Sequence, residues 1–311
     1  MYPVDGRIAV SITAAMVSEL RTKTGAGMMD CKKALTETGG DIEKAIEFLR
    51  KKGLSAAAKK ADRVAAEGMI VAADADKVGT LVEVNAETDF VSKNEAFQGF
   101  AQGVAEVVAS EKPADVEALK QLAFPGSGRT VDEELNHQIA TIGENMSIRR
   151  FETFVAEAGQ VTSYIHAGGK IGAMVQLDTT SSDAKVSALG KQLAMHVAAA
   201  NPLFLSRDEV PADVVEKEKD IMRVKAKESG KPDEIVEKII LGQINKYFGE
   251  VCLLEQAFVI DPDQKVTKVV AALAKELGTD INLSGYVRMQ LGEGIEKKED
   301  NFADEVASLT K

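Results

Sequence analysis

The chain has 311 residues, enough for two or three domains that each bury a core of their own. Its formal net charge of −11 argues against nucleic acid as the main partner, because a phosphate backbone requires a clustered basic surface. No signal peptide is expected, since the opening MYPVDGR has neither a basic start nor an apolar stretch, and no apolar run approaches a membrane span. We therefore expect a cytoplasmic protein that binds neither membrane nor nucleic acid directly.

The two cysteines, Cys31 and Cys252, lie far apart in the sequence. A single disulfide between them stays an alternative, but Cys31 falls within a predicted amphipathic helix, where a buried free thiol is the usual role. A cytoplasmic location would keep thiols reduced.

Three short amphipathic helices are predicted at the N-terminal end of the chain. Their expected ranges are Thr13–Thr24, Met28–Thr38 and a third segment that begins after Asp41, a good N-cap, and stops at Gly53. A bundle of this size is typical of a binding module. The stretch from Ala56 to Arg63, rich in Ala and Lys, then predicts a helical or flexible linker.

Past the linker, the apolar pattern changes to that of strands and longer helices. We expect strands at Met69–Ala73 and Val78–Val84 joined by a turn at Asp74–Lys77, a helix at Asn94–Ser110, a loop marked by Pro125, Gly126 and Gly128, a helix at Val131–Ile142 and a strand at Ile148–Val155. This succession indicates a small antiparallel sheet with covering helices.

One pattern occurs twice. Lys77–Val84 reads KVGTLVEV and Lys170–Leu177 reads KIGAMVQL, and in both places a short strand precedes the segment and a helix follows at the same distance. In these two helices, the residues that line up are Ala101, Val104 and Ala105 with Ala194, Val197 and Ala198. The repeat predicts two related α+β subdomains, each a small antiparallel sheet covered by helices.

The second copy is interrupted by a strongly helical segment from Asp213 to Phe248, which has a break at Ser229-Gly230-Lys231-Pro232. Two apolar-striped helices joined by a turn predict an antiparallel helical hairpin. After it we expect a strand at Cys252–Ile260, a helix near Val266–Leu277 and a strand at Gly285–Leu291.

No arrangement of residues suited to catalysis is apparent. The three histidines, His137, His166 and His196, show no metal-ligand spacing with one another or with the cysteines. Gly168-Gly169-Lys170 partly matches a phosphate-binding loop, but Ile171 replaces the required Ser or Thr and Tyr164 the first glycine, so a tight turn is the preferred interpretation. We expect a protein that is not an enzyme and has no metal or cofactor of its own.

The loop between the strand that ends at Val84 and the following helix contains a large apolar residue, Phe90, beside Asp89. Either Phe90 folds back onto the sheet, or it is exposed and binds a partner, since aromatic residues carry disproportionate binding energy at interfaces. The second copy of the repeat has Ser181-Ser182-Asp183 at this place and no aromatic residue. A requirement of the fold would be expected in both copies, so the difference favours partner binding.

Several motifs together resemble the bacterial elongation factor Ts family. They are the stretch Thr24–Leu35 that reads TGAGMMDCKKAL, Thr88-Asp89-Phe90-Val91, Ile142-Gly143-Glu144-Asn145, Arg149-Arg150, His166-Ala167-Gly168, Met195-His196 and Gly292-Glu293-Gly294-Ile295-Glu296. The resemblance covers nearly the whole chain from Ile12 onward, including the hairpin. The residues before about Ile12 and the loop Phe124–Thr130 depart from the family pattern.

The resemblance implies an α+β fold with an N-terminal three-helix module similar to ubiquitin-associated (UBA-like) domains and a duplicated core. The implied domains are the UBA-like module at 8–55, a linker at 56–66, a core N-subdomain at 67–157, a core C-subdomain at 158–207 and 249–295, an inserted helical hairpin (coiled coil) at 208–248 and a C-terminal module at 296–311.

The resemblance also implies a function in translation. Members of the family bind the GTPase elongation factor Tu and drive out its bound GDP, so that GTP can enter. A loop that matches Thr88, Asp89, Phe90 and Val91 inserts its aromatic side chain into the GTPase domain, which disturbs the Mg²⁺ site and loosens the phosphates. The resemblance assigns the role of this inserted side chain, the wedge, to Phe90, and the adjoining polar contact to Asp89. The GDP and Mg²⁺ belong to the partner.

Further partner contacts implied by the resemblance are Arg21, Met28, Met29 and Lys32 in the N-terminal module and Ile142, Gly143 and His166 in the core. Of Met28 and Met29, we expect one to pack in the bundle and the other to be exposed. A homodimer, a one-to-one complex and a two-to-two complex stay open. The rival functions are a UBA-like adaptor that acts on no GTPase, an enzyme with an unrecognised site and an RNA-binding translation protein.

Overall fold

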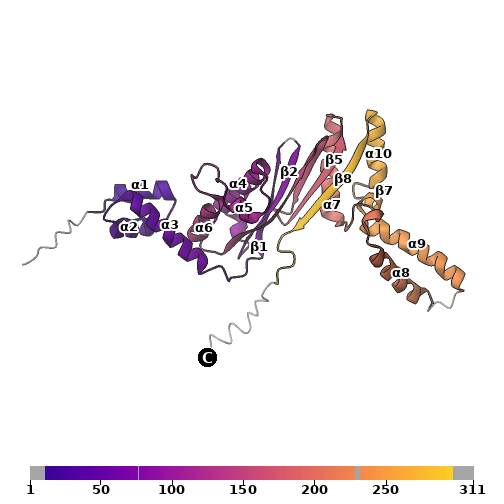
Figure 1. Cartoon of the computed structure of the whole chain (residues 1–311), viewed down its shortest axis with the longest axis horizontal. Helices are drawn as coiled ribbons and strands as arrows, with labels where there is room; N and C mark the ends of the chain where they lie inside the picture. Colours follow the sequence, from indigo (N-terminus) through magenta and orange to yellow (C-terminus); the bar gives the residue numbers. More distant parts are fainter. Residues whose placement is uncertain (1–10, 76, 228–231, 297–311) are drawn as a thin grey trace, which may run out of the picture.

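The computed structural model describes residues 11–75, 77–227 and 232–296. Figure 1 shows an elongated molecule, with three helices at one end, small sheets and their covering helices in the middle, and a helical hairpin at the other end. This is the α+β class that the sequence predicts. Four predictions extend outside the described residues: the module start at 8–10, residue 76 of the expected turn, the break at 229–231 and the C-terminal module beyond residue 296.

The N-terminal module consists of α1 (Ala14–Thr24), α2 (Met28–Glu37) and α3 (Ile42–Ala58). Side chains cap two of these helices: Thr13 accepts a hydrogen bond from the Met16 N–H, and Asp41 accepts one from the Lys44 N–H. The small core between the helices comprises Val17, Leu20, Cys31, Ala34, Leu35 and Ala45. Cys31 is a buried free cysteine, as predicted.

Helix α3 does not stop at Gly53, as predicted, but continues to Ala58. Gly53 is buried where α3 packs against α6 (Val131–Ile142), and a Cβ atom there would lie 3.7 Å from Cβ of Ala140. Arg50 of α3 and Glu133 of α6 form an ion pair across this contact. The glycine therefore allows a close helix–helix approach and does not end the helix, and the beginning of the expected linker is helical.

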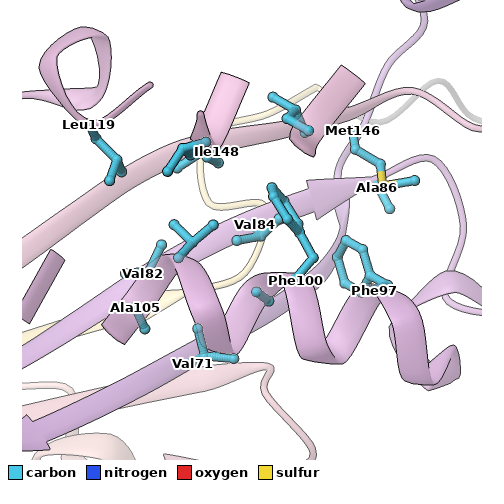
Figure 2. Packing of buried hydrophobic residues seen from close by; sticks show 14 of the residues in the cluster. Val71, Val82, Val84, Ala86, Phe97, Phe100, Ala105, Leu119, Met146 and Ile148 are labelled. Carbon is cyan, nitrogen blue, oxygen red and sulfur yellow. The ribbon is translucent and has the colours of Figure 1, made fainter. Parts of the chain in front are cut away.

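The first sheet has the antiparallel order β1 (Glu67–Ala75), β2 (Val78–Ala86) and β3 (Met146–Val155). One face is covered by α4 (Glu95–Glu111), α6 and the short α5 (Val116–Lys120), which was not predicted. Figure 2 shows the core between them, where Phe97 and Phe100 of α4 pack against Val84 and Ile148 of the strands.

The second sheet has the antiparallel order β4 (Gln160–His166), β5 (Ile171–Thr179) and β8 (Ile281–Gln290). Helices α7 (Ala184–Ala200) and α10 (Val266–Leu277) pack against it. The predicted bounds of α10 are confirmed, whereas β8 begins well before the predicted Gly285.

The strand predicted at Cys252–Ile260 is mostly wrong. This stretch forms a short helical turn, η3 (Leu253–Glu255), and the two-residue strand β6 (Ala257–Phe258), which pairs with β7 (Asp261–Lys265). The backbone N–H groups of Leu253 and Leu254 donate to the carbonyls of Phe204 and Leu205. Cys252 and Leu253 are fully buried beside that loop, so their hydrophobicity reflects burial and not membership of a long strand, whereas Val259 and Ile260 are exposed.

Helices α8 (Ala212–Lys227) and α9 (Asp233–Val251) lie side by side and project from the second sheet (Figure 1). Ala226, Val236 and Ile240 are buried between them. They occupy the segment in which the sequence predicts two helices.

The two sheets pack face to face, with their covering helices outside. The buried residues between them are Ile70, Leu81, Ala156, Val161, Met174 and Met289. Gly79 and Gly172, which occupy the same place in the two copies of the repeat, lie at this contact: a Cβ on Gly79 would be 2.4 Å from Cγ1 of Val161, and one on Gly172 would be 2.6 Å from Cγ2 of Ile70. Only glycine fits the two positions without a shift of the facing side chains.

Both sheets carry a β-bulge at the same point of the repeat. In the first sheet Glu83 pairs with Arg150 and Val84 with Ile148, so Arg149 is an extra residue in β3. In the second sheet the register shifts between Gln176 and Leu177, which correspond to Glu83 and Val84 in the repeat. The two central strands, β2 and β5, therefore share their position, their glycine and their bulge.

Candidate functional site

The loop that carries Phe90 follows β2 and leads through the short helical turn η1 (Val91–Lys93) into α4. Asn94 caps α4 by accepting hydrogen bonds from the N–H groups of Ala96 and Phe97. Val91 is 5% exposed and packs in the core beneath α4, whereas Phe90 is 77% exposed. The alternative in which Phe90 folds back onto the sheet is therefore wrong, and its ring lies in solvent.

Polar contacts hold the exposed ring and its neighbours. The Lys93 ammonium lies 5.6 Å from the centroid of the Phe90 ring, within the range of a cation–π contact, and its Nζ is 3.6 Å from Oδ2 of Asp89. The Ser92 hydroxyl donates to the Asp89 carbonyl at 2.6 Å. The tip of the loop is thus a short, hydrogen-bonded turn that presents an apolar ring beside a carboxylate.

The base of the loop is bound to the segment that follows α6. The backbone N–H and the hydroxyl of Thr88 donate to the two carboxylate oxygens of Glu144, at 3.0 and 2.7 Å. In the neighbouring pair the loop supplies the acceptor instead of the donor: Oε1 of Glu87 accepts a hydrogen bond of 2.5 Å from the backbone N–H of Asn145. The two adjacent pairs join segments that lie far apart in the sequence.

Ile142 and Gly143 stand at the C-terminal end of α6, directly before Glu144. Gly143 is exposed and has a left-handed conformation, with φ of 92°, and its N–H donates to the Ile139 carbonyl, which ends the helix. Ile142 is half-buried and packs against the core of the first sheet. The structure therefore brings Ile142 and Gly143 together with the Phe90 loop on one part of the surface.

The predicted contact residues of the N-terminal module are all exposed: Arg21 near the end of α1, and Met28, Met29 and Lys32 on α2. Met28 is 61% and Met29 75% exposed, so the expectation that one of them packs in the bundle is wrong. The bundle is filled by Cys31, Ala34 and Leu35. Met28 and Met29 lie four and three residues before Lys32, so the three side chains share the outer face of the helix.

His166 ends β4 and is exposed, and the Tyr164 hydroxyl lies 2.9 Å from its Nδ1. The residues after it form the tight turn into β5, with left-handed conformations at Ala167, Gly168 and Gly169, which confirms the turn interpretation of this glycine pair. The Gly169 carbonyl accepts a hydrogen bond of 2.7 Å from the Ile70 N–H. His166 therefore stands where the second sheet meets β1, outside the hydrogen-bonded loops around Phe90.

The other two histidines have structural surroundings. Burial lowers the pKa of His196, although a hydrogen bond with Gln256 opposes this effect, and burial together with the charge of Arg129 lowers the pKa of His137. Within the described ranges, no group of three or more His, Cys, Asp or Glu side chains is arranged to hold a metal ion. The described helices include none that is long and apolar enough to cross a membrane.

Sequence reasoning placed Glu144 in a family motif but gave it no role, and it missed Glu87, Asn145 and Lys93 as supports of the loop. Thr88 and Glu144 are 56 residues apart, so no spacing rule connects them. Lys93 lies four residues after Asp89, and this spacing is the one local signal for the ion pair.

Comparisons with known proteins agree over nearly the whole chain. A family model described as elongation factor TS matches residues 87–293. The protein named elongation factor Ts from Syntrophotalea carbinolica is 68% identical over 303 residues, which are 97% of this chain and 100% of that protein. The proteins of the same name from Magnetococcus marinus and Paramagnetospirillum magneticum are 55% and 54% identical, and the matches cover 97% and 96% of this chain and 100% and 96% of theirs. The chain therefore belongs to the elongation factor Ts family of translation elongation factors.

Proposed function

We propose that this protein binds elongation factor Tu in its GDP form and promotes the exchange of GDP for GTP. The observation that carries the proposal is the 77% exposed ring of Phe90 on a hydrogen-bonded loop, in a member of the elongation factor Ts family. Membership in that family supports the identity of the partner. It also supports the predicted cytoplasmic location, because translation takes place there.

In the proposed mechanism, Phe90 acts as the wedge. Its ring enters the GTPase domain of the partner, Asp89 makes the adjoining polar contact, and the resulting shift displaces Mg²⁺ and loosens the phosphate site, so that GDP leaves. Thr88 and Val91 have other tasks in the same loop. Thr88 attaches its base to Glu144, and the buried side chain of Val91 anchors it in the core of the first sheet.

The energetics require more than the wedge. The exchange factor and the nucleotide must weaken each other's binding by the same factor, because linkage is reciprocal. A thousandfold weakening corresponds to about 4 kcal/mol, whereas burial of one Phe side chain supplies about 1.5–3 kcal/mol. Contacts of the N-terminal module through Arg21, Met28, Met29 and Lys32, and of the core through Ile142, Gly143 and His166, would supply the remainder. All of these except the half-buried Ile142 are exposed.

The finer architecture belongs to the same proposal. We take the α1–α3 bundle to be UBA-like, α8 and α9 to be an inserted coiled-coil hairpin, and the core to be a duplication. The matching bulges and the reciprocal glycine contacts at Gly79 and Gly172 support the duplication. On this proposal the protein is not an enzyme, and its stoichiometry with the partner, one-to-one or two-to-two, is open to measurement by light scattering.

Replacement of Phe90 by Ala tests the function. We expect F90A to keep much of the partner affinity, because the other contacts remain, and to lose about 90% or more of the maximal GDP release rate, because the ring acts chiefly while GDP is being displaced. Stopped-flow release of a fluorescent GDP from elongation factor Tu, measured over a range of exchange-factor concentrations, separates the maximal rate from the half-saturating concentration.

The matched control is L241A, which truncates an apolar side chain of α9 that is 59% exposed and far along the chain from the loop. L241A should release GDP as the unchanged protein does. A maximal GDP release rate for F90A equal to that of L241A would contradict the wedge role of Phe90. If the unchanged protein does not stimulate GDP release at all, the proposed function is wrong and the UBA-like adaptor is favoured.

A further inference from the structure

We propose that Glu144 is a positioning residue for exchange: its carboxylate fixes the base of the loop and thereby sets the direction in which Phe90 leaves the surface. This inference rests on the proposed function and adds to it a residue that would not touch the nucleotide site itself. Glu144 is half-buried, and it follows Gly143 directly, outside the loop that carries the wedge.

The geometry of the Glu144 contact is that of a two-point clamp. Oε2 accepts the backbone N–H of Thr88 at 3.0 Å, and Oε1 accepts the Thr88 hydroxyl at 2.7 Å. Hydrogen bonds to an ionised acceptor are stronger than neutral ones, and two parallel bonds to one residue fix its orientation as well as its position. One carboxylate thus holds both the main chain and the side chain of Thr88, which precedes Phe90 by a single residue.

A second connection runs beside the first. The Glu87 carboxylate accepts the Asn145 N–H at 2.5 Å, and the Asn145 side-chain amide donates to the Arg63 carbonyl at 2.7 Å. Consecutive residues of the Phe90 loop therefore bond to consecutive residues of the segment after α6. Two adjacent pairs prevent the loop from pivoting about a single attachment point.

On the other side of Phe90, the buried Val91 anchors the chain in the core. The exposed tip, Asp89 and Phe90, is thus held at both ends, by Glu144 through Thr88 and by the core through Val91. An exposed aromatic ring on a free loop would have to be ordered whenever the partner binds, and that cost would reduce the free energy available to displace the nucleotide. Because the hydrogen bonds to Glu144 order the base of the loop when the protein folds, the partner does not have to order it on binding.

The first test measures the loop in the isolated protein. The chain contains no Trp, so F90W introduces a single indole whose fluorescence anisotropy reports on the mobility of that position. Adding E144A should lower the anisotropy, because Thr88 loses both acceptors. Adding E144Q should leave it close to that of F90W alone, because a glutamine can accept the Thr88 N–H with its oxygen and donate to the Thr88 hydroxyl with its nitrogen.

The second test measures nucleotide release with Phe90 in place. We expect E144A to reduce the maximal GDP release rate about tenfold while the half-saturating concentration changes less than about threefold, the separation that a positioning role produces. E144Q should restore most of the rate. T88V, which keeps the backbone bond and loses the hydroxyl bond, should fall between E144A and the unchanged protein, and T88S should match the latter. The control is E106A, which alters an exposed glutamate of α4.

The outcomes separate the clamp from the wedge. The positioning role of Glu144 is overturned if the fluorescence anisotropy of F90W is the same with and without E144A. It is also overturned if E144A and E106A have the same maximal GDP release rate while F90A has lost most of its own; this second result leaves the proposed function standing. Loss of exchange in E144A with an equal loss in E144Q also overturns it. The T88V and T88S pair decides the matter if E144A does not fold.

Discussion

Glu83 is a carboxylate with no exposed surface, in the middle of the central strand of the first sheet. Burial by itself would raise its pKa, but hydrogen bonds from the Gly292 N–H and from the side chains of Arg150, Arg149 and Asn85 outweigh burial and lower the pKa below its usual value. The bulge explains the two arginines. Successive side chains of a regular strand point to opposite faces, whereas the extra residue in β3 lets neighbours reach one acceptor, at 3.0 and 2.7 Å.

We predict that E83Q destabilises the protein by about 1.5–3 kcal/mol, because it removes the buried negative charge that accepts hydrogen bonds from the half-buried Arg149 and Arg150. Urea unfolding at pH 7 measures the effect, with E152Q on the exposed part of β3 as control. Because the folded-state pKa of Glu83 is lowered, its stabilisation is fully present above the unfolded-state pKa of about 4.3 and is lost as the pH falls through the lower folded-state value. The difference in unfolding free energy between the unchanged protein and E83Q should therefore shrink in acid. Equal midpoints for E83Q and E152Q would contradict the prediction.

The contact of α7 with the β6–β7 turn depends on one histidine. The Val259 N–H donates to Nδ1 of His196 at 3.1 Å, so this nitrogen carries no proton, and Nε2 donates to the Gln256 side-chain oxygen at 2.9 Å. Protonation would place a second donor against the Val259 N–H inside the core. The arrangement therefore requires a neutral imidazole, in agreement with the lowered pKa of His196.

We predict that stability rises with pH across the range in which His196 titrates. Because its folded-state pKa lies below the unfolded value of about 6.5, the folded state binds fewer protons, and stability is full above that value and falls as the pH drops below it. Unfolding free energies between pH 5 and 8 should rise more steeply for the unchanged protein than for H196N. His137 contributes equally to both curves, so their difference isolates His196. Parallel curves would refute the prediction.

At the scale of the whole molecule, the two sheets pack as two identical subunits of a dimer would. Gly79 of β2 faces Val161 of β4, and the corresponding Gly172 of β5 faces Ile70 of β1. Val161 and Ile70 correspond as well, because they pair with Gln176 and Glu83, the equivalent bulge residues. Such reciprocal contacts are the rule in twofold interfaces. The buried residues between the sheets join the two halves into one core.

We predict that G172A destabilises the protein by about 1–3 kcal/mol through overpacking, since its Cβ would lie 2.6 Å from the Ile70 side chain. The matched control is G99A in α4, where no atom lies within 4 Å of the added Cβ and alanine favours the helix by about 0.5–1 kcal/mol. Thermal unfolding should therefore shift in opposite directions for the two Gly-to-Ala changes. A G172A protein as stable as G99A would contradict the prediction, because it would show that the contact accommodates a methyl group without strain.

The sequence by itself determined the elements whose signals are local. The predicted bounds of α6 and α10 agree with the structure, because apolar periodicity and end signals, including the Thr130–Glu133 capping box and Gly278, act within a few residues. The repeat identified β2 and β5, which are the two central strands. For the site, comparison of the two copies favoured an exposed Phe90, and the family resemblance supplied the remaining contact residues.

The tertiary structure alone decided what depends on residues far apart in the chain. Gly53 stays helical because α6 packs against it, and Cys252 and Leu253 are buried beside a loop and add no long strand. The face-to-face contact of the sheets and the bond between Thr88 and Glu144 join segments that no sequence period connects. Local patterns report propensity and burial, whereas the identity of the packing partner is a property of the folded chain.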